Sequence, residues 1–186
     1  SNDGQVYFTK NGGRSWENLT KNIDMPPWGT ISNIEASRFD KSTAYISVDF
    51  HQMGDFDPYI YKTADYGKSW KFISGNIPKS YSSFVHVVRE DHKSPGVLYA
   101  GVDNGIYISG DDGENWTRIK NNLPPAPVYW ISLQEHFDDM VVGTYGRGFY
   151  ILDDISPFRE LANTNIENVN FMPVQDAYRF QSKQSI

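Results

Sequence analysis

A short turn motif recurs three times along this chain of 186 residues. Each copy reads Ser/Thr-x-Asp/Asn-x-Gly-x-x-Trp, and the copies are TKNGGRSW at 9–16, TADYGKSW at 63–70 and SGDDGENW at 109–116. The third positions of successive copies are 54 residues (65 − 11) and 46 residues (111 − 65) apart. Self-similarity at a period of about 50 residues indicates a repeat architecture, in which each repeat is one supersecondary unit.

The residue types of the motif are those of a hairpin turn between two short strands. An acid or amide at the third position can accept hydrogen bonds from backbone N–H groups just ahead of it. The glycine can supply a positive φ, and the tryptophan is a large anchor to bury against a neighbouring sheet. We therefore expect a structural role for nine residues: Asn11, Gly13, Trp16, Asp65, Gly67, Trp70, Asp111, Gly113 and Trp116.

The motif closely resembles the Asp-box, or bacterial neuraminidase repeat, although the first copy carries Asn11 in place of the acid. This repeat occurs in sialidases, in sortilin-type propellers and in xyloglucan-degrading enzymes, which share a fold and not a reaction. The segment GRGFYILDDISPF at 146–158, followed by AYRF at 177–180, resembles large bacterial repeat proteins described as sortilin-like or glycosyl-hydrolase-like. That resemblance implies an exported bacterial protein, in the periplasm, at the cell surface or secreted.

The segments between the motifs repeat as well. Two further apolar strands follow each motif, and we predict them at 31–36 and 43–48, at 84–88 and 97–102, and at 129–133 and 140–144. Four antiparallel strands per unit is the composition of one propeller blade. We therefore predict an all-β fold, a partial β-propeller of about three to four blades in which the motif joins the last two strands of each blade.

The predicted domain covers residues 1–157, with an incomplete first blade, two full blades and an incomplete last blade. Residues 158–186 are expected to be a C-terminal extension or a linker towards a following domain, with one further strand at 171–180. Propellers typically have four to eight blades. We therefore expect a fragment that pairs with the remaining blades of a larger chain, and whose exposed blade edges favour self-association.

Composition excludes several classes of function. The net charge of −6 argues against a nucleic-acid partner, because phosphate binding relies on basic patches. The sequence has no apolar run of about 18 residues, and so no predicted membrane span. The absence of cysteine excludes disulfides, thiolate zinc sites and a cysteine nucleophile. We expect no cofactor.

Candidate binding residues lie in the connections opposite the motif. The longest is Asp49–Pro58, which we call the finger, and it carries His51, Asp55 and Asp57 among aromatic residues. It could contact a glycan, a peptide or a cation, since loop insertions are where function concentrates. It could equally be a solvated loop packed on its own aromatic side chains.

Other connections carry further candidates. Tyr145 and Arg147 lie in a glycine-flanked loop, where the guanidinium could bind a carboxylate or pair with an acid of a neighbouring blade. Trp28 and Tyr81 lie between blades and could stack on sugar rings or cap the sheets. Trp130 is expected in the core.

The sequence does not assemble a catalytic site. A glycosidase needs two carboxylates across a cleft, and a sialidase needs an arginine cluster, for which only Arg38, Arg89 and Arg147 remain outside the motifs and the tail. His86 and His92 with Glu90 lack a further ligand for a metal site. Two hypotheses stay open: a non-catalytic propeller module that binds protein or glycan, or part of a glycoside hydrolase completed by other blades.

Overall fold

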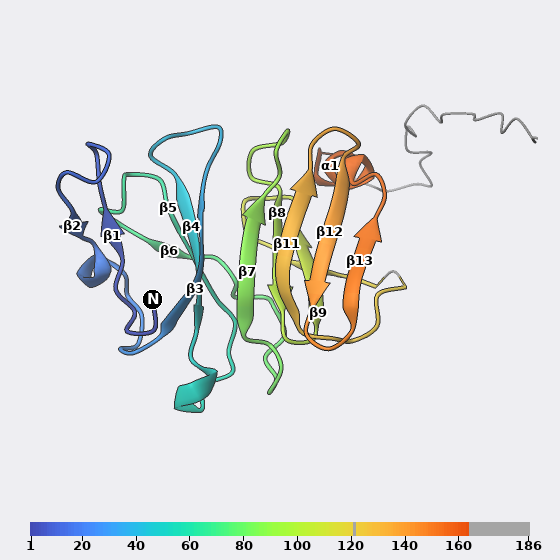
Figure 1. Cartoon of the computed structure of the whole chain (residues 1–186), viewed down its shortest axis with the longest axis horizontal. Coiled ribbons are helices and arrows are strands. Elements are labelled where there is room, and N and C mark those ends of the chain that lie inside the picture. The colour runs from blue at the N-terminus through green and yellow to red at the C-terminus, as the bar shows by residue number, and fades with distance from the viewer. Residues whose placement is uncertain (121, 164–186) are drawn as a thin grey trace, which may run out of the picture.

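The computed structural model describes residues 1–120 and 122–163, and its strands form four antiparallel sheets (Figure 1). Sheet 1 contains β1 (Tyr7–Phe8) and β2 (Glu17–Asn18). Sheet 2 contains β3 (Thr30–Ala36), β4 (Ala44–Asp49), β5 (Tyr59–Thr63) and β6 (Lys71–Phe72). Sheet 3 contains β7 (Val85–Glu90), β8 (Leu98–Val102), β9 (Gly105–Ser109) and β10 (Thr117–Ile119). Sheet 4 contains β11 (Val128–Gln134), β12 (Asp139–Thr144) and β13 (Gly148–Leu152).

Each sheet is a meander in which neighbours in sequence pair in order, so the prediction of a partial propeller with four-stranded antiparallel blades is confirmed. Two 3₁₀ turns, η1 (Thr20–Asn22) and η2 (His51–Met53), and one helix, α1 (Ser156–Asn163), complete the elements. The further strand predicted at 171–180 lies outside the described residues.

The core lies between successive sheets, in three layers of apolar side chains. Phe50 and Ile46 lie in the layer between sheets 1 and 2, Tyr45 and Trp116 in the layer between sheets 2 and 3, and Ile131 in the layer between sheets 3 and 4. The first strand of sheet 3, β7, packs against the first strands of both flanking sheets, β3 and β11. The sheets are therefore stacked side by side like the blades of a propeller (Figure 1).

The three turn motifs have one hydrogen-bond pattern. In the second copy, the hydroxyl of Thr63 accepts from the N–H of Gly67 at 2.9 Å, and Asp65 accepts from the N–H of Ser69 at 2.9 Å. The first and third copies repeat both bonds within 0.1 Å. The motif glycines have φ values of +88°, +80° and +86°, which only glycine adopts without strain.

Burial of the motif tryptophans differs between the copies. Trp116 is 5% exposed, and its indole N–H donates to the carbonyl of Ile73 in sheet 2 at 2.6 Å. Trp70 packs against the layer between sheets 1 and 2. Trp16 is 61% exposed, so the expectation of a buried anchor is wrong there. Trp70 and Trp116 pack towards the preceding sheet, whereas no described sheet precedes sheet 1, which carries Trp16.

The last repeat ends in a helix, where the other repeats have the motif. Asp154 occupies the position of the motif acid, and its carboxylate accepts a hydrogen bond from the N–H of Ser156 at 3.0 Å, the first residue of α1. A carboxylate at this position is favourable, because the first N–H groups of a helix have no partner within it. The helix α1 crosses the boundary expected after residue 157, and Phe158 packs against the core between sheets 3 and 4.

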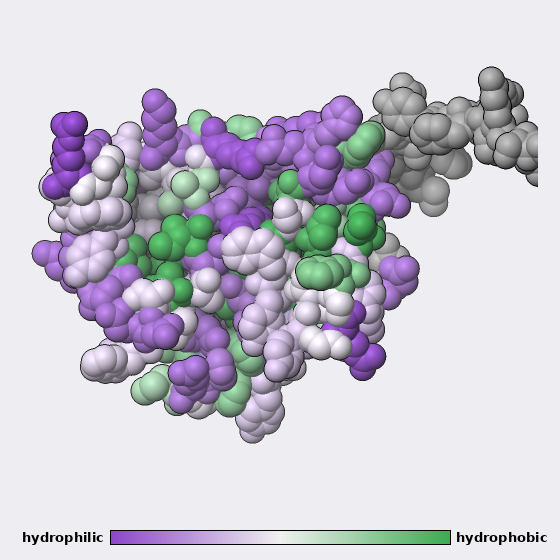
Figure 2. Space-filling view, viewed as in Figure 1, coloured by the Kyte–Doolittle hydropathy of each residue, from purple (hydrophilic) through white to green (hydrophobic). Residues whose placement is uncertain are grey.

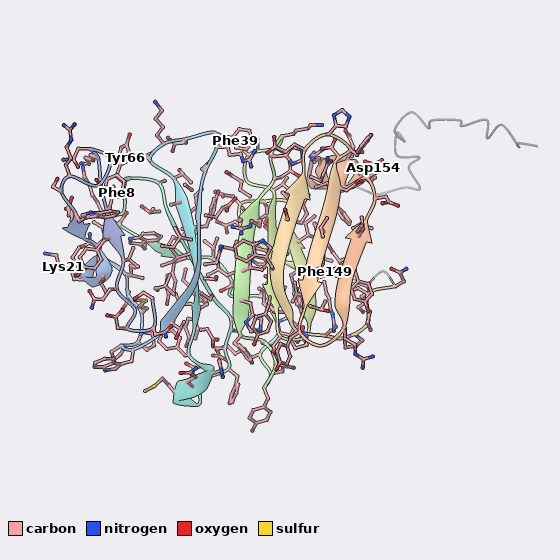
Figure 3. All side chains as sticks on the ribbon, in the orientation of Figure 1. Phe8, Lys21, Phe39, Tyr66, Phe149 and Asp154 are labelled. Carbon is pink, nitrogen blue, oxygen red and sulfur yellow. The ribbon has the colours of Figure 1, made fainter. Side chains whose placement is uncertain are left out.

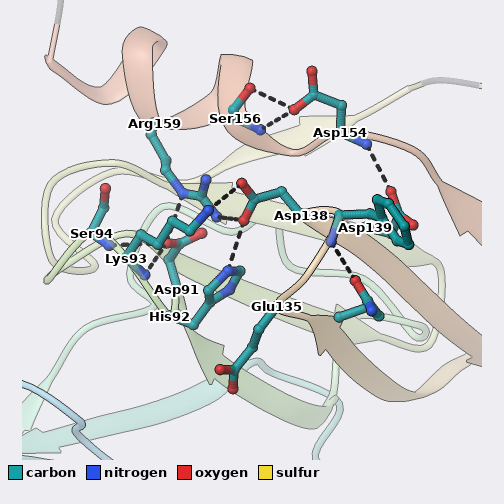
Figure 4. A network of polar contacts seen from close by, with 12 residues as sticks. Asp91, His92, Lys93, Ser94, Glu135, Asp138, Asp139, Asp154, Ser156 and Arg159 are labelled. Carbon is teal, nitrogen blue, oxygen red and sulfur yellow. Dashed lines mark hydrogen bonds and ion pairs between the residues drawn. The ribbon is translucent and has the colours of Figure 1, made fainter. Parts of the chain in front are cut away.

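A network of charged side chains joins α1 to sheets 3 and 4 (Figure 4). The guanidinium of Arg159 donates to Asp91 at 2.8 Å and to Asp138 at 3.0 Å. Lys93 also pairs with Asp138 at 2.6 Å, and the side chain of Asp91 is fully buried. Burial of Asp138 raises its pKa, but the hydrogen bonds from Arg159 and Lys93 lower the pKa by a larger amount. The net result is a pKa of about 2.

The side of sheet 4 that faces away from sheet 3 is apolar and open. Figure 2 shows hydrophobic side chains gathered over this sheet, and Figure 3 labels Phe149 there. Trp130, Phe149 and Ile151 are 53%, 83% and 66% exposed. The expectation of a core position for Trp130 is wrong, because a β-bulge before it shifts the alternation of β11 and Ile131 faces the core instead.

None of the helices in the described part of the chain is long and apolar enough to cross a membrane.

Candidate functional site

The stacked sheets have two distinct ends. The end we call the turn end carries the motif turns and the first hairpin loop of each blade, with Phe39 and Asp154 labelled along it in Figure 3. The opposite end, which we call the loop end, carries η2, the β4–β5, β8–β9 and β12–β13 loops, and the connections between sheets (Figure 1). Because the turn end is occupied by self-contained hydrogen bonds, the loop end is where side chains remain available for a ligand.

The finger folds over the loop end through its own polar contacts. Nδ1 of His51 lies 2.7 Å from the Asp49 carboxylate at the end of β4, and the ring of His51 stacks on Phe84 at 4.7 Å. The hydroxyl of Tyr59 donates to Asp55 at 2.7 Å. Asp57 pairs with Lys79. The finger is thus a fixed loop, packed on its own aromatic side chains and on the connection that follows β6.

The finger and this connection border an open depression with a volume of about 410 Å³, lined by Gly54–Asp57 and Lys79–Tyr81. Tyr81 is 86% exposed, and its ring meets Phe56 at 5.5 Å. The structure therefore brings together three of the predicted site residues: Asp55, Asp57 and Tyr81. An open depression with an aromatic wall and a few fixed polar groups can contact one face of a ligand.

An aromatic row extends from this depression across sheets 3 and 4. Its rings meet in the order Tyr81, Phe56, Phe84, His86, Tyr129 and Tyr145, with neighbouring centroids between 4.0 and 6.1 Å apart. Tyr129 is 49% exposed and Tyr145 is 71% exposed. The sequence therefore gives the two ends of the row, Tyr81 and Tyr145, but not the residues that connect them.

The sequence did not predict the place of His86 and Tyr129 in this row, since His86 was considered only as a metal ligand and Tyr129 only as part of a strand. His86 is 7% exposed, and Nε2 lies 3.3 Å from the Asp103 carboxylate. Burial lowers the pKa of His86, and the contact with Asp103 only partly opposes this change, so the imidazole is neutral near pH 7. The sequence does show a histidine or tyrosine near the start of each of two predicted strands, His86 in 84–88 and Tyr129 in 129–133, and this similar placement could have indicated a shared role.

Other predicted residues lie apart from this row. Trp28 lines a separate cavity of about 530 Å³ beside Asp3–Gln5, Thr20–Lys21 and Met25–Pro27. Arg147 is exposed in the β12–β13 loop next to Tyr145. His86 lies near the start of β7, and His92 lies two residues beyond its end, 2.7 Å from Asp138. Among residues 1–120 and 122–163, no three His, Asp or Glu side chains are placed to hold a metal ion.

Two of the three arginines considered for a sialidase cluster already have acidic partners. Arg89 donates to Glu35 at 2.6 Å and lies over the ring of Trp130 at 4.3 Å, and Arg38 pairs with Glu135. Both line a cavity of about 220 Å³ on the first strands of the sheets, whereas Arg147 lies in the β12–β13 loop. The described arginines therefore do not form a triad.

Similar proteins are propellers of several kinds. The oligoxyloglucan-reducing end-specific xyloglucanase of Emericella nidulans is 32% identical over 82 residues, which cover 42% of this chain and 10% of the enzyme. The GH74 xyloglucanase from Xanthomonas campestris has a TM-score of 0.62 at 17% identity, covering 81% of this chain and 24% of that one. A structure of YCF48 bound to D1 peptide has a TM-score of 0.56 at 17% identity, covering 80% of this chain and 44% of that one.

The chain thus spans about a tenth of the xyloglucanase that it matches by sequence, and less than half of each of these two structures. At such identities, the structural likeness shows the fold alone. Residues 4–146 match the family Sortilin-Vps10, described as "Sortilin, neurotensin receptor 3". This match covers more than half of the chain, which therefore belongs to the Sortilin-Vps10 family.

Proposed function

We propose that this chain is a non-catalytic propeller module that binds a glycan or protein ligand at its loop end, within a larger exported bacterial protein. The observation that carries the proposal is the aromatic row, which crosses two sheets and ends in strongly exposed tyrosines. Exposed aromatic rings beside fixed polar groups are typical of recognition surfaces. Among the similar proteins, YCF48 is bound to the D1 peptide, and the xyloglucanases are named for a glycan substrate.

The carboxylates at the loop end favour binding over hydrolysis. Asp49, Asp55, Asp57 and Asp103 each contact a neighbouring side chain, respectively His51, Tyr59, Lys79 and His86. A glycosidase needs one carboxyl group to donate a proton and another to act as nucleophile or base across the scissile bond. Carboxylates that already accept hydrogen bonds or ion pairs from neighbouring side chains are poorly suited to the proton-donating role.

A glycoside hydrolase completed by other blades is the second candidate. It is supported by the 32% identity to the Emericella nidulans xyloglucanase over 82 residues. In that case, Asp55 and Asp57 beside the 410 Å³ depression are the acids to test. Release of reducing ends from xyloglucan oligosaccharides, abolished by Asp55→Asn or Asp57→Asn, would favour the enzyme.

Isothermal titration with xyloglucan oligosaccharides and with the D1 peptide tests the binding function. We expect binding without release of reducing ends, weakened about tenfold or more in the double variant Tyr145→Ala, Arg147→Ala, because a central aromatic contact contributes about 1–2 kcal/mol. Phe39→Ala is the matched control, because Phe39 is 45% exposed at the turn end. Equal losses in both variants, or no binding of either probe, would contradict the proposal.

A further inference from the structure

The first strands of three successive sheets carry a β-bulge at the same place. The pairing with the second strand shifts between Ile31 and Asn33, between Val85 and Val87, and between Val128 and Trp130. The extra residues are Ser32 in β3, His86 in β7 and Tyr129 in β11. Bulges leave one residue unpaired, re-aim its side chain and are over-represented beside functional sites.

The three bulge residues differ in what they do. The hydroxyl of Ser32 stays within the sheets, 2.8 Å from the hydroxyl of Ser47 and 3.0 Å from the carbonyl of Val85. The ring of His86 lies beneath that of Tyr129, with centroids 4.0 Å apart and planes at 22°. Only Tyr129 is substantially exposed, at 49%. The bulge position is thus structural in sheet 2 and ligand-accessible in sheet 4.

His86 is fixed from several sides. Phe84 meets its ring edge-on at 5.0 Å, and the Asp103 carboxylate lies 3.3 Å from Nε2. Asp49 and His51 are the other ionisable groups that face it. A ring held in this way sets the plane and position of the Tyr129 ring that stacks on it.

We propose that Tyr129 is a specificity-determining residue that contacts a neutral glycan, and that His86 is the positioning residue which fixes its ring. This inference rests on the proposed function and assigns its ligand class. Tyr129 stacks against one face of a sugar ring, and the exposed Tyr145 ring, 5.6 Å away, extends the same platform.

The charge balance of the row favours a neutral ligand. Three carboxylates of the loop end, Asp49, Asp57 and Asp103, already contact His51, Lys79 and His86. An anionic ligand group would be repelled by these carboxylates, and a cationic one would have to displace a partner that they already contact. A sugar ring needs no such exchange, because it offers an apolar face to the aromatic ring and hydroxyl groups to its edges.

The test measures the affinity of the folded chain for xyloglucan oligosaccharides. We expect Tyr129→Ala to weaken binding about tenfold or more and His86→Ala about fivefold or more, within the range of anchor residues. His86→Phe should restore most of the affinity, because it keeps a stacked ring without the imidazole nitrogens. Ser32→Ala is the matched control and should bind like the unmodified chain.

A second measurement needs no variant. Bound oligosaccharide should slow the nitration of Tyr129 by tetranitromethane, read by mass spectrometry, and leave Tyr66 at the turn end unaffected, where it is 42% exposed. Binding that is lost in Tyr145→Ala, Arg147→Ala but unchanged in Tyr129→Ala and His86→Ala would overturn this inference and leave the proposed function standing. Binding of the D1 peptide alone would overturn the ligand class, and binding of neither probe would overturn both proposals.

Discussion

The motif tryptophans offer a test of how the sheets are held together. Trp116 is 5% exposed in the layer between sheets 2 and 3, and its indole N–H donates to the carbonyl of Ile73. Truncation of a buried tryptophan to alanine costs about 3–5 kcal/mol through lost burial and the cavity left behind. The carbonyl of Ile73 loses its donor as well. We therefore expect Trp116→Ala to lower the free energy of unfolding by about 3–5 kcal/mol.

The assay is urea unfolding followed by far-ultraviolet circular dichroism. With a denaturant slope of about 2–3 kcal/mol/M for a chain of this size, the midpoint should fall by about 1–2.5 M. Trp116→Phe keeps most of the apolar area and loses the hydrogen bond, so we expect a loss of about 1–2 kcal/mol.

Trp16 is the matched control, because it occupies the same position of the same motif but is 61% exposed. We expect Trp16→Ala to change the free energy of unfolding by no more than about 0.5 kcal/mol. Similar losses in the two alanine variants would refute the conclusion that these tryptophans stabilise the fold by packing on the preceding sheet.

Further predictions concern the turns, the charge network, acid stability and the open sheet. Gly67→Ala should cost about 2–3 kcal/mol in urea unfolding, because its Cβ would lie 2.2 Å from Leu19, whereas Gly54→Ala, with a similar φ and open space around it, should cost about 1 kcal/mol. Arg159→Met should cost about 3 kcal/mol, because it leaves the buried Asp91 without its cation, and the exposed pair partner Arg38→Met should cost less than about 1 kcal/mol. Hydrogen bonds from Ser69 lower the pKa of Asp65 to about 2, and that of Asp138 is also about 2. The two ionised carboxylates therefore stabilise the fold above the unfolded pKa of about 3.9, and this stabilisation is lost as the pH falls from about 4 to about 2. The melting temperature should drop between these two pH values, and it should drop less steeply in Asp138→Asn. Sedimentation should show concentration-dependent association that Phe149→Ser, Ile151→Ser reduces, and a monomer at every concentration would contradict the role of the open face of sheet 4.

The repeat was predictable because its determinants are local. Turn chemistry at Asp65 and Gly67 depends on residues only a few positions apart, and strand alternation follows from the apolar pattern. Both signals are read from a single segment, and they give the number and order of the strands. The ends of the aromatic row, Tyr81 and Tyr145, were predictable for a similar reason, because they lie in loops between recognisable strands.

The features that the sequence did not reveal depend on pairing between segments. A bulge is defined by the register of two strands, so the exposure of Tyr129 and Trp130 could not be inferred from β11 alone. The difference between Trp16 and Trp116 depends on whether a sheet precedes each one. The helix α1 is held against sheets 3 and 4 by the pairing of Arg159 with Asp91, a residue 68 positions away.

The most direct test of the central claim is a nuclear magnetic resonance titration of the isotope-labelled chain with xyloglucan oligosaccharides. The account predicts chemical-shift changes at the loop end, confined to residues 49–57, 79–86, 103, 129 and 145–147. Changes centred on the turn motifs at 9–16, 63–70 and 109–116, with the aromatic row unaffected, would contradict it.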